Sequence, residues 1–159
     1  MILTLLKLVG ITFIPALELR ASIPIGIHVY KMNFVAVFFI CVIANFLLGI
    51  IFYWVLDQFA KLLCRNSAFN RLYQKVLLRN QKKIQQIVDK YGELGVAIFI
   101  GIPLPGTGVY SGAIGSYAIG LKFKKFILAD LIGVIIAGIL VTIASLIGGG
   151  IFAFFIKTV

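Results

Sequence analysis

Two oppositely charged side chains interrupt the first apolar stretch of this sequence. Glu18 and Arg20 lie two positions apart within residues 2–30, which are otherwise mostly apolar. An ionised side chain at the centre of a bilayer costs roughly 2.5–3.5 kcal/mol even on insertion scales, and such residues commonly serve transport. We expect residues 15–24 to form an open tip from which both side chains point into one cavity, where Arg20 holds an anionic group and Glu18 takes up and releases a proton. The structural alternatives are mutual pairing, helix capping, or a position of this segment at the membrane interface.

A second interruption has the sequence Pro-Leu-Pro-Gly-Thr-Gly and ends in Pro105, Gly106, Thr107 and Gly108. Proline disrupts the hydrogen bonds of a helix, so the chain should open here. If a helix resumes afterwards, its free amides point toward the break, where helix N-termini attract anions. We expect these four residues to bind substrate together with Arg20. A plain N-cap by Thr107, with glycines that only permit the turn, is the alternative.

Two uninterrupted apolar runs, residues 34–56 and 126–148, flank these features. At about 1.5 Å per residue, each is long enough to cross a hydrocarbon core of about 30 Å. The composition agrees, because 62% of the residues are hydrophobic and 13% charged, more apolar than a soluble protein of this size can bury. Within the runs, Asn45 is expected to join helices, and Asp130 to form an interfacial ion pair or to serve as a second acid.

The broken segments, residues 2–30 and 94–120, predict re-entrant hairpins rather than spans. Each arm of roughly 10–13 residues reaches only about the bilayer centre. Open backbone at that depth is tolerated where protein buries it or where it lines a cavity. Ile14-Pro15 and Ile102-Pro103 are each followed by an Ile-Gly pair at similar spacing, which favours an internal repeat.

The charge distribution orients these segments. Residues 57–93 carry eight cations against Asp57, Asp89 and Glu93, and further lysines follow residue 120. The positive-inside rule makes both regions cytoplasmic, so the second hairpin returns to its face of entry and the first enters from the opposite face. Apolar residues at helical spacing within 57–93 predict an amphipathic helix on anionic lipid. No motif for reading nucleic acid accompanies the cations, which are Lys61, Arg65, Arg71, Lys75, Arg79, Lys82, Lys83 and Lys90.

Catalytic motifs are missing from the sequence. It has no Ser-His-Asp set, no Walker loop and no cluster of metal ligands around its one histidine, His28. We expect no enzyme activity, no cofactor and no metal.

The two interruptions resemble the signatures of a known family. Residues 15–26, Pro-Ala-Leu-Glu-Leu-Arg-Ala-Ser-Ile-Pro-Ile-Gly, resemble the P-x-x-E-L-R-x-x-I-P-x-G signature of the putative small multidrug export family, and residues 103–108 resemble its second signature. That family is similar, more distantly, to the DedA and VTT-domain membrane proteins, whose members have been linked to moving phosphate-bearing lipid carriers or scrambling phospholipids. The resemblance implies roles for Glu18 and Arg20 and for Pro105 to Gly108. The chain is shorter than the DedA pattern and lacks an arginine at the second interruption.

Taken together, the sequence predicts an all-α integral membrane protein with one domain, residues 1–159. Residues 1–56 form a hairpin and a span, 57–93 the cytoplasmic amphipathic segment, and 94–159 an inverted hairpin and a span. The expected function is a proton-coupled transporter or lipid flippase of the inner or plasma membrane. Its substrate is an amphiphile with an anionic, phosphate-like head group. The alternatives are export of lipophilic cations through Glu18 and a non-transporting membrane scaffold. Four apolar elements barely enclose a cavity, which favours a homodimer.

Overall fold

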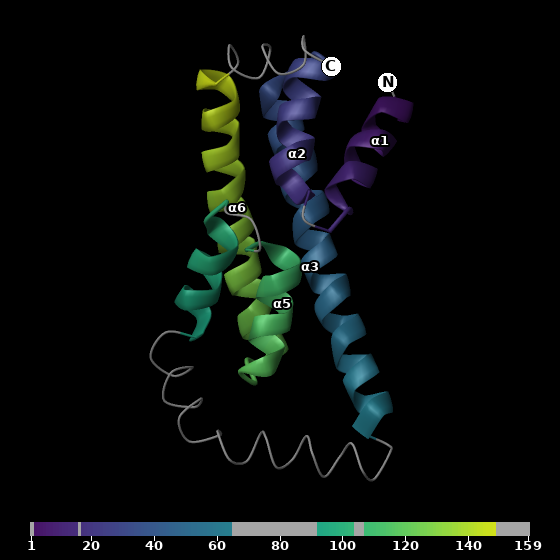
Figure 1. Ribbon diagram of the computed structural model, residues 1–159, viewed down its shortest axis with the longest axis vertical. Coiled ribbons are helices and arrows are strands. Elements are labelled where there is room, and N and C mark those ends of the chain that lie inside the picture. The colour runs from purple at the N-terminus through teal and green to yellow at the C-terminus, as the bar shows by residue number, and fades with distance from the viewer. Residues whose placement is uncertain (1, 16, 65–91, 104–106, 149–159) are drawn as a thin grey trace.

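The computed structural model describes residues 2–15, 17–64, 92–103 and 107–148. Every regular element in these ranges is a helix, as the all-α prediction requires (Figure 1). The predicted amphipathic helix falls mostly in residues 65–91, outside the described residues. In chain order the elements are α1 (Ile2–Thr12), α2 (Glu18–Pro24), the π-helical turn η1 (Ile25–Val29), α3 (Phe34–Cys64), the helix Gly92–Gly101, α5 (Val109–Ala118) and α6 (Phe123–Ile147).

The two predicted spans are the two long helices α3 and α6. Both are long and apolar enough to cross a membrane, by length and composition. Helix α3 continues beyond the predicted end at residue 56. Asp57 and Lys61 therefore lie one turn apart on the helix and form an ion pair of 2.6 Å. Helix α6 ends at Ile147, one residue before the predicted end of the second apolar run.

Small residues let α3 and α6 approach closely. A Cβ atom on Gly138 would lie 2.7 Å from Val42 and 2.9 Å from Phe38, both on α3. On α3 itself, Gly49 faces Asp130 of α6 so closely that a Cβ atom would collide with the carboxylate. Small residues at helix contacts replace the hydrophobic driving force that lipid cannot provide. This packing places the Asp130 carboxylate of α6 against α3.

The first broken segment folds as a helix, a turn and a second helix. Helices α1 and α2 pack against each other and are joined through residues 13–17. The expectation that residues 15–24 stay open is wrong for residues 18–24, which are helical. Pro24 removes one backbone donor, but the chain continues in η1, where Tyr30 N donates to Ile25 O over 3.0 Å in an i to i+5 bond.

The second broken segment opens where the prolines predicted. The helix Gly92–Gly101 ends before Pro103, and α5 begins at Val109 after Gly108. In Figure 1 the turns of the two helical pairs meet near the middle of the molecule, and the pairs extend from there in opposite directions. The two interruptions of the sequence are thereby brought together.

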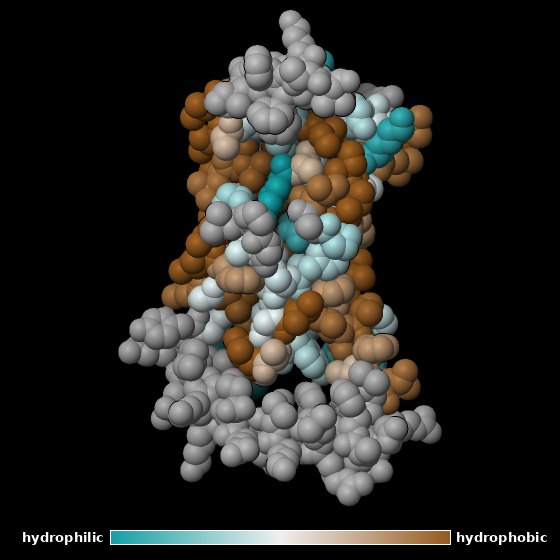
Figure 2. Space-filling view, viewed as in Figure 1, coloured by the Kyte–Doolittle hydropathy of each residue, from teal (hydrophilic) through white to brown (hydrophobic). Residues whose placement is uncertain are grey.

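The outer surface of the described helices is strongly apolar. Figure 2 shows hydrophobic residues along both flanks of the molecule, with a narrower strip of hydrophilic residues between them near mid-height. Trp54 is 57% exposed and Ile147 is 82% exposed, and other large apolar side chains are exposed along α3 and α6. Such surface is far larger than the patches that soluble monomers carry, and lipid is the environment that suits it.

Candidate functional site

Polar contacts join the two turns. The Nη2 atom of Arg20, on α2, donates to both the carbonyl and the hydroxyl oxygen of Thr107 over 2.7 Å. The hydroxyl of Tyr110, on α5, donates to the carbonyl oxygen of Phe13 over 2.6 Å. Each turn therefore satisfies polar groups of the other, as buried or lipid-facing backbone requires.

Glu18 sits at the N-terminus of α5. Its carboxylate is 4% exposed, and its Oε2 atom accepts a hydrogen bond of 3.1 Å from the backbone N–H of Val109. The first amides of a helix have no partner within the helix and favour an anion. The chain's own carboxylate therefore occupies part of the position where the sequence predicted a substrate anion.

Gly108 makes this approach possible. Its φ is +121°, which L side chains rarely adopt, and a Cβ atom there would lie 2.5 Å from Oε2 of Glu18. Gly108 is also the N-cap of α5, without a side-chain cap, so the alternative that Thr107 caps this helix is wrong. The Thr107 hydroxyl instead donates to the carbonyl oxygen of Ile102 over 2.6 Å and closes the turn. Pro105 and Gly106 lie outside the described residues.

A cavity of about 280 Å³ opens beside Arg20. Its walls combine prolines of both broken segments with small and apolar residues of α6, namely Pro24, Pro103, Leu140, Val141, Ala144 and Ser145. Arg20 is the charged residue among those that line it, and Glu18 is not one of them. The expectation that both charged side chains point into one cavity is therefore wrong for Glu18. Because Glu18 begins a helix rather than lying in an open turn, residues two apart face different directions.

The model of the putative small multi-drug export protein family matches residues 18–140. The chain belongs to this family. The matched range begins at Glu18 and contains Arg20, α3, the second turn, α5 and most of α6. Comparison with curated proteins and with solved structures gave no match. Family membership and the two long apolar helices together make this a membrane-associated protein of a multidrug export family.

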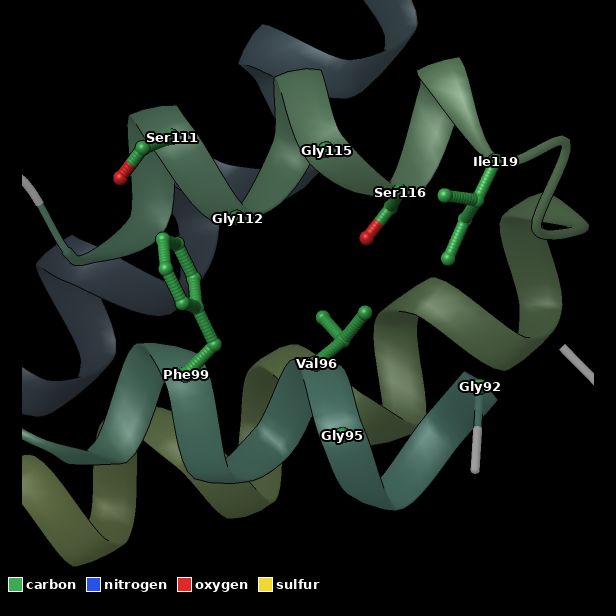
Figure 3. A pocket seen from close by; sticks show the side chains of 9 residues that line it. All are labelled: Gly92, Gly95, Val96, Phe99, Ser111, Gly112, Gly115, Ser116 and Ile119. Atoms are coloured by element: carbon green, nitrogen blue, oxygen red, sulfur yellow. The ribbon is translucent and has the colours of Figure 1, made fainter. Parts of the chain in front are cut away.

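A second cavity of this family member lies between the helix Gly92–Gly101 and α5. It measures about 300 Å³, and its lining combines glycines with Val96, Phe99, Ile119, Ser111 and Ser116. Figure 3 shows Val96 and Phe99 projecting from one helix toward α5, with the Ser116 hydroxyl directed into the space between the helices. The walls carry no charged side chain, so this cavity suits an apolar group.

The surroundings of Asp130 differ most from those that the sequence predicted. The Asp130 side chain is fully buried, and within the described residues neither carboxylate oxygen has a hydrogen-bond partner. Its expected ion pair with the nearby lysines is therefore wrong, and Lys125 pairs with Glu93 over 2.8 Å instead. The prediction failed because sequence distance from a lysine says nothing about which face of α6 the carboxylate occupies.

Other site residues gave little or no signal in the sequence. The α6 wall of the Arg20 cavity consists of ordinary span residues, and among them only Ser145 carries a polar side chain. His28 lies next to this wall, with Nε2 2.9 Å from the carbonyl oxygen and 3.0 Å from the hydroxyl of Ser145. A serine and a histidine in apolar segments were a weak signal. Their pairing depended on the packing of η1 on α6.

Proposed function

We propose that this protein is a transporter that carries an amphiphile with an anionic, phosphate-like head group across the membrane, coupled to protons. The observation that supports it best is the cavity between the two turns, whose charged lining residue is Arg20. An arginine fork matches phosphate and carboxylate geometry, and the apolar α6 wall suits the start of a hydrocarbon tail. The family's multidrug export description agrees with an amphiphilic substrate.

In this proposal α3 and α6 span the inner or plasma membrane, and the two helical pairs are re-entrant hairpins from opposite faces. Helix α1 has 11 residues, which at about 1.5 Å per residue cover roughly half of a 30 Å hydrocarbon core. The turns then lie near the midplane, and residues 57–93 face the cytoplasm under the positive-inside rule. Inverted broken helices that meet at the midplane are a recurrent architecture of secondary transporters.

The positions of the two charged side chains favour an anionic over a cationic head group. Arg20 lines the cavity, whereas Glu18 is buried against the N-terminus of α5. A cation approaching through this cavity would meet a guanidinium first, and like charges repel. The distant likeness to DedA and VTT-domain proteins stays a prediction, and a phosphate-headed lipid is the substrate class that agrees with it.

Lipid movement in proteoliposomes tests the proposal. Purified protein is reconstituted into vesicles that contain a phosphatidylglycerol with a fluorescent head-group label, and an impermeant quencher measures its movement between leaflets under a pH gradient. We expect Arg20→Ala to lower the rate at least tenfold and Arg20→Lys to retain part of it, because lysine keeps the charge without the fork. Lys61→Ala, at an exposed ion pair on α3, is the matched control and should leave the rate unchanged.

The family description supports export of lipophilic cations as a second candidate. In that case tetraphenylphosphonium would move in the same vesicles, Glu18→Gln would abolish its transport, and Arg20→Ala would leave it intact. Movement of neither probe would favour the membrane scaffold. We also propose that the protein acts without enzyme activity or cofactor. A homodimer remains part of the proposal because four apolar elements enclose little space, and cross-linking in vesicles tests it.

A further inference from the structure

We propose that Asp130 is a proton-binding site of this protein, distinct from the Arg20 cavity and from Glu18. The inference rests on the proposed transport function, to which it assigns the residue that holds the coupling proton. It places that residue on the span α6 rather than at the first turn, where the sequence predicted Glu18 for this role.

The environment of Asp130 supports a neutral carboxyl group. The side chain is fully buried, and in the part of the chain that the structure describes neither of its oxygens has a hydrogen-bond partner. A buried ionised carboxylate without a partner is strongly disfavoured and takes up a proton instead. Lys125, the cation nearest in sequence, does not compensate it, because Lys125 binds Glu93.

Gly49 leaves room for the Asp130 carboxyl group because it has no side chain. Oδ2 of Asp130 lies within contact distance of the position that a Gly49 Cβ atom would take, and Cγ1 of Val109 lies 2.7 Å from the same position. Helices α3, α5 and α6 therefore meet around this carboxyl group. Asn45, one turn before Gly49 on α3, is 1% exposed, and its Oδ1 atom has no hydrogen-bond partner among the described residues.

Glu18 connects the Asp130 site to the two turns. Val109, which packs beside Asp130 at Gly49, is also the residue whose N–H binds Glu18. The carboxyl groups of Glu18 and Asp130 therefore both lie next to Val109. Two nearby acids that share a buried region do not both ionise readily, because like charges repel. A change at the turn that moves Glu18 therefore alters the proton held by Asp130.

Two tyrosines on the surrounding helices have hydrogen-bond partners of their own. The hydroxyl of Tyr53, on α3, donates to the carbonyl oxygen of Leu121, and the hydroxyl of Tyr110, on α5, donates to that of Phe13. In the proposed cycle, one Asp130 oxygen forms an O–H bond with a proton delivered by water. On release, the proton passes back to a water molecule and leaves a carboxylate, so charge and atoms balance.

Infrared spectroscopy of the full chain in lipid vesicles tests the site without any transported substrate. A protonated carboxyl group has a C=O stretching band that a carboxylate lacks, and ¹³C-labelled aspartate shifts this band for aspartates alone. The chain has three aspartates, Asp57, Asp89 and Asp130. The double variant Asp57→Asn, Asp89→Asn is the matched control, because Asp130 is then its only aspartate.

We expect an aspartate-sensitive band at pH 7 in the wild type and the double variant, and its complete loss in Asp130→Asn. Asp130→Glu keeps a carboxyl group at the site and should restore a band that follows glutamate labelling. A band that persists in Asp130→Asn, or that is lost only in Glu18→Gln, overturns the proposal. A wild-type band that appears only after sodium is removed would assign the site to sodium and overturn it as well.

The two proposals fail in different ways. If the transport function is wrong, the Asp130 band remains while lipid movement does not depend on Arg20. If the Asp130 site is wrong, lipid movement still depends on Arg20 while the band is absent.

Discussion

The two turns at the centre of this protein contribute different kinds of groups. The first turn leads directly into α2 and supplies charged side chains, Glu18 and Arg20, from helical residues. The second turn supplies mainly backbone groups at or before the start of α5, namely the Thr107 carbonyl and the Val109 amide, together with the Thr107 hydroxyl. Charge on one side thus meets backbone dipoles on the other, which requires a close approach that only a glycine at Gly108 allows.

The helical pairs around the turns also differ at the glycines of the short repeat. A Cβ atom on Gly26 would lie 2.7 Å from Val37, whereas one on Gly115 would have nothing within 4 Å. Gly26 is therefore required for packing against α3, and Gly115 is not required in this way. The two pairs have similar shapes but different packing, so the repeat does not imply equal roles for equivalent residues.

The largest expected effect is a loss of stability on substitution of Gly108, with Gly115 of the same segment as the comparison. Gly108→Ala places a side chain at φ +121° and against the Glu18 carboxylate. The backbone conformation alone should cost about 1–3 kcal/mol of the free energy of unfolding. Gly115 lies within α5, where a Cβ atom has nothing within 4 Å. Gly115→Ala should therefore leave the free energy of unfolding unchanged or raise it by up to about 1 kcal/mol. Unfolding in mixed detergent micelles measures both, and equal effects would contradict the assigned role of Gly108.

A smaller effect is expected for the contact between Arg20 and Thr107. In a double-mutant cycle of Arg20→Ala and Thr107→Ala, the coupling energy should be about 1 kcal/mol, below the 1.5–3 kcal/mol of buried charged hydrogen bonds, since Arg20 is only partly buried. The same cycle with Ser111→Ala, whose hydroxyl contacts Gly108 O at 3.4 Å, should give no coupling. Absence of coupling in the Thr107 cycle would mean that the hydrogen bond between Arg20 and the Thr107 hydroxyl does not hold the two turns together.

The smallest effect concerns Tyr110, at the edge of the same contact. Tyr110→Phe removes the hydrogen bond to Phe13 but keeps the edge-on ring contact with Phe52, whose centroid lies 4.7 Å away. Because the bond is exposed, its loss should lower the free energy of unfolding by about 0.5 kcal/mol. A loss above about 1.5 kcal/mol would show that this edge, rather than Gly108 and Glu18, holds the turns in place.

Much of the fold could be predicted because it depends on local properties of the chain. The long apolar runs predicted α3 and α6, and the prolines near residue 103 predicted the break before α5. The end of α3 was missed because a helix continues past the apolar run wherever charged residues can pair along it, as Lys61 and Asp57 do. The helical start at Glu18 was missed because Pro24 predicted an open chain before it, whereas Pro24 is the last residue of α2.

The sequence by itself determined that this chain has two long apolar helices and two proline-broken segments with polar residues at their breaks. Length, hydropathy and proline chemistry act locally along the chain, so their effects can be predicted without a structure. Only the tertiary structure decided the partners: Glu18 with the amide of Val109, and Arg20 with Thr107 and a cavity wall on α6. It also left the Asp130 carboxylate without a hydrogen-bond partner among the described residues. Those outcomes depend on which helix faces meet, and residues more than 80 positions apart in the chain meet only after packing.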